Sequence, residues 1–371
     1  MYNILYLSGS VNLWGARRSL LDLLQNIDRR EFSVSVVCSK KGPLTGELEK
    51  RKINYTIIPL PLWRKGKNLP RIPSSILSLV KVIKEKNIHL IHCNSHWVNP
   101  YGTIAARLTK RKVICHLRDV ITTDKIQKYF IYRSDRIIVI SNFLKQIFNC
   151  YRAMKGKVEL VYNGIDTTVF LRRKEKEIAD FKMKWGIKQS EYVIGCVGQL
   201  SSLKGQEYLL RAVPFILRRF PKTKFLLCGE VRRERDEGRM ESVVQELNIE
   251  RNITFTGWQD DLPAVYSSLD ILAFPTLKEA FGRVAVEALS CQVPVVATKV
   301  GGVPEIVNDE KDGILVPPKS SPHLANGIMR ILQNPELKRR MGEEGRRKVM
   351  EKFTLKKTVS QIENIYYSLL S

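Results

Sequence analysis

The sequence lacks the short patterns that mark several common kinds of functional site. It contains no Cys-x-x-Cys pair, so its seven cysteines do not have the spacing of a zinc ribbon or a redox-active dithiol. The glycine patterns of dinucleotide-binding and ATP-binding loops, G-x-G-x-x-G and G-x-x-x-x-G-K-[ST], are also absent. No apolar run approaches the ~20 residues of a membrane-spanning helix. The sequence therefore indicates neither a membrane span nor a site built on any of these patterns.

Acidic residues are scarce in the first half of the chain. Residues 1–170 hold 29 Lys and Arg against 11 Asp and Glu, a net charge of +18, whereas the rest holds 33 against 26, a net of +7. This basic half favours an anionic partner, and nucleic acid and anionic lipid are both candidates. Because the chain has no helix-turn-helix, zinc finger or RNP-type aromatic strand, we expect no nucleic-acid partner.

The chain opens directly on a strand pattern, and no basic and apolar leader precedes it. Most cysteines lie in or beside apolar runs, where a thiol acts as a small hydrophobic group. From these features we expect a cytoplasmic protein with plain core or surface thiols.

Short apolar runs rich in β-branched residues alternate with helical stretches along the whole chain. Such runs are typical of parallel strands that are buried on both faces, and the alternation indicates βαβ units. The sequence predicts strands at residues 3–7, 33–38, 54–60, 88–93, 112–117, 135–140 and 158–162, and then at 192–198, 224–229, 253–257, 270–275, 293–297 and 313–316. We therefore predict an α/β protein with two Rossmann-like, doubly wound domains that face a central cleft.

A charged stretch of low apolar content, residues 172–177, lies between the two sets of strands and suits a domain boundary. At the other end, residues 355–369 carry apolar side chains at helical spacing. We predict an N-terminal Rossmann-like domain at 1–170, a C-terminal Rossmann-like domain at 171–354, and a final helix at 355–371 that packs back toward the N-terminal domain.

The most informative stretch contains Glu279 and Glu287, eight positions apart in Glu-Ala-Phe-Gly-Arg-Val-Ala-Val-Glu. An apolar strand and the pair Gly301-Gly302 follow it. Two carboxylates a little over two helical turns apart, with the first at the helix mouth, can point into one crevice. Open α/β sheets bind their ligands in such crevices at strand ends.

Two glycine-containing loops follow predicted strands. In the first, Gly15 precedes a helix and can present backbone N–H groups to an anion or a sugar, although a plain structural turn fits equally well. In the second, Lys204 stands between a strand end and a helix, where it can pair with a diphosphate. A solvated loop lysine is the alternative there.

The histidines include one cleft candidate. His89, His92 and His96 resemble a metal cluster, but the first two lie on opposite faces of a strand and nothing completes a tetrahedron, so we expect no metal site. His116 differs, because it ends an apolar run and a strand end is where a polar group meets substrate.

No Asp-x-Asp occurs, although sugar transferases that neutralise a diphosphate with a divalent ion usually have such a pair. Its absence favours neutralisation by Lys204, Arg283 and helix N-termini. We expect a metal-independent reaction without a cofactor.

These features together resemble the retaining glycosyltransferases of family 4, the "group 1" transferases of the GT-B fold. The resemblance covers essentially the whole chain and is most specific at residues 275–305, where Glu279 and Glu287 form the E-x7-E pair. The other matching segments are residues 140–141, 163–166 with Phe170, 255–258, 270–271 and 312–316.

The resemblance implies roles for individual residues. Glu279 looks like the residue that binds the hydroxyls of the transferred sugar, and Glu287 looks like the ribose-binding carboxylate. The backbone N–H groups of Phe281 and Gly282 should approach the sugar or the diphosphate. Donor contacts are likewise expected from Arg283.

Three further positions complete the implied site. Lys204 should neutralise the leaving diphosphate, Gly15 should cradle it or the acceptor, and His116 matches a histidine placed beside the sugar. The family usually has an arginine where this chain has Gln199, so one diphosphate cation is missing. The resemblance does not imply any residue as a covalent nucleophile.

The implied reaction moves a hexose-type sugar from a nucleotide-sugar donor to a glycan or lipid-linked acceptor, with retention of configuration, in cell-surface polysaccharide or glycolipid synthesis. One alternative is a GT-B nucleotide-sugar epimerase, which would need a general acid and base poised over the sugar. The other is a basic nucleic-acid-binding protein, which only the net charge suggests.

A membrane surface is a further candidate partner. Residues 61–67 are basic and aromatic, and the apolar residues Ile76, Leu79, Val80 and Ile83 alternate with lysines. This pattern suits a helix on the anionic inner face of the cell membrane, and it equally suits an ordinary helix packed on the sheet.

Overall fold

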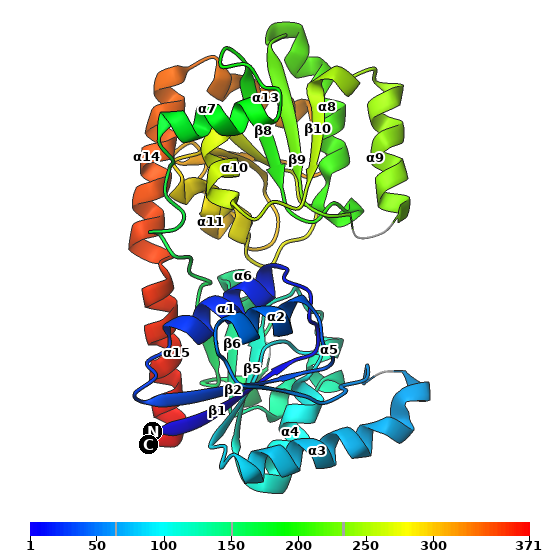
Figure 1. Ribbon diagram of the computed structural model, residues 1–371, viewed down its shortest axis with the longest axis vertical. Helices are drawn as coiled ribbons and strands as arrows, with labels where there is room; N and C mark the ends of the chain where they lie inside the picture. The colour runs from blue at the N-terminus through cyan, green and yellow to red at the C-terminus, as the bar shows by residue number, and fades with distance from the viewer. Residues whose placement is uncertain (64, 150, 232–233) are drawn as a thin grey trace. The chain divides into compact units, whose positions relative to one another are not determined.

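The structure is a computed structural model that describes residues 1–63, 65–149, 151–231 and 234–371. The chain forms two compact units, one of Met1–Gly164 with Leu355–Ser371 and one of Ile165–Thr354. Each unit is a parallel sheet with helices around it (Figure 1). The predicted fold class, two doubly wound α/β domains, is confirmed.

The sheet of the first unit has the strand order β3-β2-β1-β4-β5-β6-β7, and every neighbouring pair in it is parallel. Its strands are β1 (Tyr2–Ser8), β2 (Phe32–Cys38), β3 (Tyr55–Ile57), β4 (Leu90–Cys93), β5 (Lys112–Leu117), β6 (Arg136–Val139) and β7 (Val158–Leu160). Its helices are α1 (Gly15–Asn26), α2 (Pro43–Lys50), α3 (Ile72–Glu85), α4 (Asn99–Thr109), α5 (Asp124–Lys128), α6 (Asn142–Gln146) and α15 (Leu355–Leu370), with 3₁₀ turns η1 (Gly66–Arg71), η2 (Ile131–Arg133) and η3 (Arg152–Met154).

The C-terminal helix α15 belongs to the first unit, as the sequence predicted. Its apolar stripe packs into the core beneath α1 and the first strands, and its buried members are Leu355, Val359, Ile362, Ile365 and Tyr366. Full burial of one large apolar side chain contributes about 1.5–3 kcal/mol. The last helix of the chain is thus a structural part of the domain that the chain begins with.

The second unit has the strand order β10-β9-β8-β11-β12-β13, again parallel throughout. Its strands are β8 (Tyr192–Val197), β9 (Thr223–Cys228), β10 (Ile253–Gly257), β11 (Ile271–Phe274), β12 (Val295–Thr298) and β13 (Gly313–Val316). Its helices are α7 (Glu175–Lys184), α8 (Gln206–Arg219), α9 (Glu234–Glu246), α10 (Leu262–Ser268), α11 (Arg283–Ser290), α12 (Val303–Ile306), α13 (Ser321–Leu332) and α14 (Pro335–Lys352), with 3₁₀ turns η4 (Ser202–Lys204) and η5 (Glu250–Asn252).

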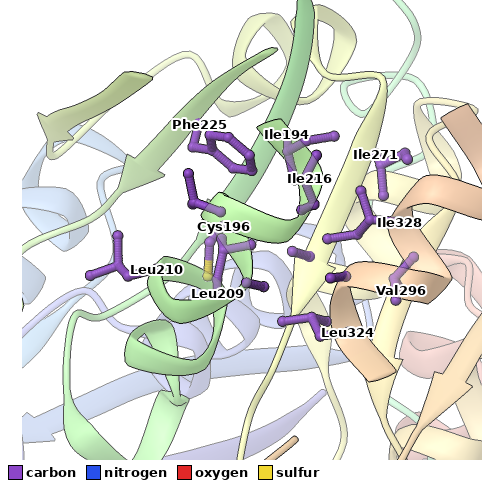
Figure 2. Packing of buried hydrophobic residues seen from close by; sticks show 14 of the residues in the cluster. Ile194, Cys196, Leu209, Leu210, Ile216, Phe225, Ile271, Val296, Leu324 and Ile328 are labelled. Carbon is purple, nitrogen blue, oxygen red and sulfur yellow. The ribbon is translucent and has the colours of Figure 1, made fainter. Parts of the chain in front are cut away.

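The core of the second unit lies between one face of its sheet and helices α8 and α13. Figure 2 shows Leu209 and Leu210 of α8 and Leu324 of α13 beside strand residues such as Ile194 and Phe225. The strands are apolar on both faces because helices cover both, which explains their continuous apolar runs. This rigid sheet positions the loops that carry the candidate site.

The first unit ends at Gly164, whereas the sequence analysis placed the boundary at residue 170. Residues 165–170 belong with the second unit because its side chains bind their backbone. Arg346 donates to the carbonyls of Thr167 and Phe170, at 3.0 and 2.9 Å, and Ser290 Oγ donates to Phe170 O at 2.6 Å.

The apolar stripe of α3 is a packing surface. Leu79 and Ile83 are buried in the core of the first unit, and Ile76 and Val80 pack against it. The interpretation in which this apolar stripe faces a membrane is therefore wrong. The lysines Lys81 and Lys84 on the same helix are exposed. Of the preceding basic and aromatic segment, Arg64 lies outside the described residues, and Trp63 packs edge-on against the Tyr101 ring.

Among the described residues, no helix has both the length and the apolar character needed to cross a membrane. The strand order reverses between β1 and β4 in the first sheet and between β8 and β11 in the second. Loops that leave the carboxyl ends of strands on either side of such a reversal are where open α/β sheets bind ligands. Each unit is therefore expected to carry functional residues in the loops after these strands.

Candidate functional site

In the second unit, Lys204 and Glu279 meet where the strand order reverses. Lys204 ends the turn η4 after β8, and Glu279 lies in the loop between β11 and α11. The ammonium Nζ is 2.6 Å from Glu279 Oε2, and both side chains are partly exposed. The two loops also join through their backbones, since Leu277 N donates to Leu203 O at 2.9 Å. A cation and a carboxylate thus stand together at a solvent-accessible strand end.

Gly205 permits this close approach of the two loops. Its φ of +69° is in the left-handed region that favours glycine, and a Cβ there would lie 2.1 Å from the carbonyl oxygen of Pro275. Any larger residue would push apart the loops that carry Lys204 and Glu279. The glycine that ends the predicted lysine loop is therefore a geometric requirement of the site.

The Glu279 carboxylate is held from several sides. Its Oε1 accepts hydrogen bonds from the backbone N–H groups of Ala280 at 3.1 Å and Phe281 at 3.4 Å. The Phe281 N–H, which the sequence analysis assigned to the donor, is directed at Glu279 in this structure. Glu279 lies four positions before the first residue of α11, rather than at the helix mouth.

The glycine pair after β12 supports the same loop. Gly302 N donates to Glu279 O at 3.2 Å, and a Cβ on Gly301 would lie 1.9 Å from that oxygen. Gly301 has a φ of +52°, so two separate requirements select glycine there. The sequence pattern that joins Glu279 to a distant glycine pair thus corresponds to direct backbone contact.

The second carboxylate of the pair, Glu287, is buried inside α11 and is only 2% exposed. Its Oε1 accepts from Arg283 Nε at 2.7 Å, and its Oε2 accepts from the Tyr266 hydroxyl at 2.8 Å. Arg283 is therefore engaged by Glu287 at the start of the helix. The sequence analysis missed Tyr266, which lies on α10, because nothing in the sequence connects it to α11.

Gly282 precedes Arg283 as the N-cap of α11, with a left-handed φ of +109°. A helix N-terminus carries partial positive charge from its unpaired N–H groups. The Glu279 loop thus leads directly into the N-terminus of α11, whose first residue is Arg283. The positive end of the helix and the guanidinium group suit an anionic ligand.

Gln199 contributes its backbone carbonyl to the hydrogen bonds that hold the Lys204 loop. The Gln206 side chain donates to Gln199 O at 3.0 Å and accepts from Ser201 N at 3.3 Å. Gln206 is buried and opens α8, so it fixes the loop that leads to Lys204. The sequence analysis did not identify Gln206.

In the first unit, buried polar side chains connect three loops that follow strands. Arg118, after β5, donates to Asn94 Oδ1 and to Asn163 Oδ1, both at 2.7 Å. Asn94, after β4, donates in turn to the carbonyl of Ala16 at 3.3 Å. Gly15, the first residue of α1, is exposed beside Ala16.

His116 lies near the end of β5 and is 1% exposed. Its Nδ1 is 3.1 Å from His92 Nε2 and 3.4 Å from an Arg118 guanidinium nitrogen. Its Nε2 is buried and has no hydrogen-bond partner among the described residues. Burial and the neighbouring Arg118 lower the pKa of His116 well below its usual value of 6.5, so the ring is neutral at pH 7.

The structure brings the predicted residues together in two groups. The second unit joins Lys204 to Glu279 and Arg283 to Glu287, and the first unit holds Gly15 and His116. Asn94, Arg118 and Asn163 were not assigned roles, although Asn94 and Arg118 directly follow β4 and β5 and Asn163 lies in the loop after β7. Since strand ends of a parallel sheet share one edge, their positions alone could have identified them.

Two family models match the chain. The model described as "Glycosyltransferase Family 4" matches residues 14–169, and the model described as "Glycosyl transferases group 1" matches residues 177–348. The two matches correspond closely to the two units.

Several known proteins are similar along most of the chain. The N-acetyl-alpha-D-glucosaminyl L-malate synthase of Bacillus anthracis is 28% identical over 308 residues, which are 79% of this chain and 78% of that enzyme. The UDP-Gal:alpha-D-GlcNAc-diphosphoundecaprenol alpha-1,3-galactosyltransferase of Escherichia coli is 23% identical over 376 residues, 96% of this chain and 95% of that enzyme.

Among solved structures, Anabaena Alr3699/HepE in complex with UDP and glucose matches with a TM-score of 0.89. The match covers 100% of both chains at 23% sequence identity, so it shows a common fold.

Proposed function

The chain belongs to the family 4, group 1 glycosyltransferases, and we propose that it moves a hexose-type sugar from a nucleotide-sugar donor to a glycan or lipid-linked acceptor with retention of configuration. The observation that carries the proposal is the contact between Lys204 and Glu279 at the strand-order reversal of the second sheet. The ion pair brings together an ammonium group that can bind a diphosphate and a carboxylate that can bind sugar hydroxyls.

We assign Lys204 to the leaving diphosphate. Breaking a sugar–phosphate bond builds positive charge on the sugar ring and negative charge on the phosphate. A fixed ammonium group stabilises the growing negative charge without reorganisation, which is usually the largest contribution to such catalysis. In the proposed complex Lys204 exchanges its bond to Glu279 for one to the diphosphate, and Glu279 then accepts from sugar hydroxyls.

Glu287 is assigned to the ribose, whose two adjacent hydroxyls are hydrogen-bond donors. Each Glu287 oxygen has a second acceptor position besides the one used by Arg283 or Tyr266. Arg283 and the backbone N–H group of Gly282, at the start of α11, are assigned to the donor. The Phe281 N–H, which is directed at Glu279 here, is assigned to the donor once Glu279 turns to the sugar.

In the first unit we assign His116 to the transferred sugar and Gly15 to the diphosphate or the acceptor. Gly15 is exposed at the start of α1, where backbone N–H groups are available to an anion. His116 is neutral, so it serves as a hydrogen-bonding group and adds no charge.

A UDP-sugar is the first donor to test. The name of the Escherichia coli relative contains UDP-Gal, and Anabaena HepE was solved with UDP-glucose as well as with UDP. The purified chain should show a rise in melting temperature with the right nucleotide sugar, because a ligand that binds only the folded state stabilises it. A panel in which no nucleotide sugar raises the melting temperature or is turned over would overturn the proposal.

The reaction itself separates transfer from the alternatives. We expect release of the nucleoside diphosphate to require an acceptor and to persist in excess EDTA, and we expect the product to keep the anomeric configuration of the donor. Conversion of the nucleotide sugar alone into another sugar would instead indicate an epimerase. Loss of turnover in EDTA, restored by a divalent ion, would contradict the metal-independent reaction.

A lipid-linked acceptor and a peripheral position on the inner face of the cell membrane form the remaining part of the proposal. The Escherichia coli relative is named for a diphosphoundecaprenol-linked substrate. The first half of the chain carries the larger net positive charge, and Leu62, Leu69 and Leu77 are exposed. Leu77 lies on α3, the helix that also carries the exposed Lys81 and Lys84. Each contacting cation adds about 1 kcal/mol on an anionic leaflet.

Sedimentation with vesicles tests this part. The chain should bind vesicles that contain anionic lipid at low salt and dissociate at high salt. The double change Lys81→Glu with Lys84→Glu should weaken binding, whereas Lys222→Glu in the second unit serves as the matched control. Absence of binding at low salt would exclude membrane association.

A further inference from the structure

Four buried polar side chains of the first unit form one continuous hydrogen-bonded chain. The Tyr6 hydroxyl is 2.7 Å from the Tyr366 hydroxyl, which is 2.6 Å from His92 Nδ1. His92 Nε2 is 3.1 Å from His116 Nδ1. The members come from β1, α15, β4 and β5, and each is at most 1% exposed. The chain therefore runs from the core of the unit to the histidine assigned to the sugar.

One contact fixes the direction of this chain. An Arg118 guanidinium nitrogen lies 3.4 Å from His116 Nδ1, and a guanidinium group can only donate. His116 Nδ1 is therefore an acceptor. Because the ring is neutral, its proton must be on Nε2.

The remaining bonds follow from this assignment. With His116 Nδ1 as acceptor, His92 Nε2 donates to it, so His92 carries its own proton on Nε2 and accepts at Nδ1. The Tyr366 hydroxyl then donates to His92 Nδ1, and the Tyr6 hydroxyl donates to Tyr366. Burial lowers the pKa of His92 well below its usual value, which agrees with a neutral ring.

The reverse direction is disfavoured. In that direction His92 Nε2 would accept the proton of His116 Nδ1, but His116 Nδ1 would also face the N–H group of Arg118 as a second donor. Two donors that face each other in a buried site have no acceptor between them. Unsatisfied donors are costly where water has no access. The described contacts thus select one tautomer.

We propose that Tyr366 and His92 are positioning residues that hold His116 as the Nε2–H tautomer, so that His116 offers a hydrogen-bond donor to the transferred sugar. The sugar clause rests on the proposed glycosyltransferase function. The Nε2 atom, which has no partner among the described residues, is the end of the chain that remains for a ligand. A hydroxyl oxygen of an uncharged hexose is the acceptor that suits it.

The Nε2–H tautomer excludes one role for His116, that of a general base at Nε2. A ring nitrogen that already carries a proton cannot accept another, so His116 in this tautomer is not a general base at Nε2. Its contribution is an oriented hydrogen bond. The Tyr366 hydroxyl on α15, acting through His92, supports that orientation together with Arg118.

Nitrogen NMR of the full chain, labelled at its five histidines, reads the tautomer directly. In the unsubstituted protein, His116 should show a protonated Nε2 and an unprotonated Nδ1 at pH 7. His116→Gln assigns the signals. Observation of a protonated Nδ1, or of a doubly protonated ring, would overturn the inference whether or not the protein transfers sugar.

Tyr366→Phe removes the donor to His92 Nδ1 and frees His92 to change tautomer. We expect a mixed tautomer at His116 and a fall in kcat of about tenfold, the effect of weakening one hydrogen bond in the transition state, with little change in the KM of the donor. An unchanged tautomer in this variant would contradict the role of Tyr366.

Four variants complete the test. Tyr101→Phe is the matched control, because Tyr101 is equally buried but does not belong to the hydrogen-bonded chain. Its hydroxyl donates to Pro61 O at 2.6 Å. Tyr6→Phe should keep the tautomer, since Tyr366 still donates to His92, and a changed tautomer there would refute the assigned direction. His92→Gln, whose amide can donate at the same place, should retain more activity than His92→Phe.

The NMR and the kinetic measurements separate two kinds of failure. If His116 has the expected tautomer but no nucleotide sugar is bound or turned over, the proposed function fails and so does the sugar clause. If transfer occurs and the tautomer is wrong, the proposed function stands and this inference falls.

Discussion

The two units place their candidate functional residues at equivalent positions in their sheets, but the chemistry of these residues differs. In the second unit, Lys204 and Glu279 form an ion pair between the loops after β8 and β11, and Arg283 pairs with Glu287 within α11. In the first unit the corresponding region holds neutral histidines, tyrosine hydroxyls and asparagine amides around Arg118. Charge suits a phosphate-bearing ligand, whereas neutral directional bonds suit orientation of hydroxyl groups.

The difference also concerns rigidity. The bonds around His116 are buried and set their directions among themselves, so they are in place before any ligand binds. The Lys204–Glu279 pair is partly exposed and can exchange its partner for a ligand. A partly exposed lysine that is held by a protein carboxylate can exchange that carboxylate for a ligand. A buried chain of neutral polar groups instead keeps its hydrogen bonds when a ligand binds. The following changes test that contrast.

Glu279→Ala should have the largest effect. It removes the proposed contact to sugar hydroxyls that strengthens in the transition state, and we expect transfer to fall by about 10³-fold or more, a magnitude comparable to loss of a central electrostatic group. The measurement is kcat/KM for the donor, with thermal unfolding to show that the protein is folded. Turnover within a factor of a few of the unsubstituted protein would refute the role of Glu279.

Glu287→Gln should lower stability in addition to weakening the proposed contact to the ribose. It leaves the buried guanidinium of Arg283 without its carboxylate, and removal of one partner of a buried pair costs about 3–5 kcal/mol, with the lower end expected because Arg283 is slightly exposed. Tyr266→Phe removes only the neutral bond to the same carboxylate and should cost about 1 kcal/mol. Urea unfolding measures both, and equal losses would mean that the ion pair is not the dominant interaction.

Lys204→Ala should lower kcat by about 10²-fold, because one fixed cation is lost from the leaving diphosphate. Lys224→Ala is the matched control, since this lysine is also in the second unit and its Nζ donates to the carbonyl of Arg251 at 2.7 Å. Steady-state kinetics with the donor distinguishes the two. A change in KM with unchanged kcat would show that Lys204 contributes ground-state binding only.

The neutral histidines of the first unit predict a pH dependence of stability. His92 and His116 have pKa values well below the usual 6.5 in the folded protein because of burial and Arg118, so the unfolded state binds more protons below pH 6.5. Stability is therefore complete above pH 6.5 and is lost as the pH falls below it, by about 1 kcal/mol per histidine at pH 5.5.

Urea unfolding at pH 7.5 and 5.5 measures this loss. His92→Gln should remove about half of it, whereas His323→Gln, at an exposed position of α13, should leave it unchanged. A loss of equal size in all three proteins would show that other groups cause the pH dependence.

The strands could be predicted from the sequence because burial on both faces imposes continuous apolar runs, as in residues 293–297. Lys204 and Glu279 could be found because each has a fixed position relative to a strand end and a glycine turn. Tyr266 and Tyr366 could not, since their partners lie on other elements and only the folded chain brings them together.

The α3 helix illustrates a second limit of prediction. Helical periodicity identifies an apolar stripe such as Leu79 and Ile83, but it does not say whether protein or membrane covers the stripe. The unit boundary lies six residues before the predicted one for a related reason, because Arg346 and Ser290, far along the chain, bind the backbone of residues 165–170.

The position of α15 has a consequence for synthesis. The first unit begins the chain, yet Tyr6 and Phe32 in its core pack against helix residues that include Tyr366. A ribosome must therefore make the whole second unit before the first can close its core. Until residues 355–371 emerge, the nascent first unit presents an uncovered apolar face to the cell, a stage at which a chaperone would bind it.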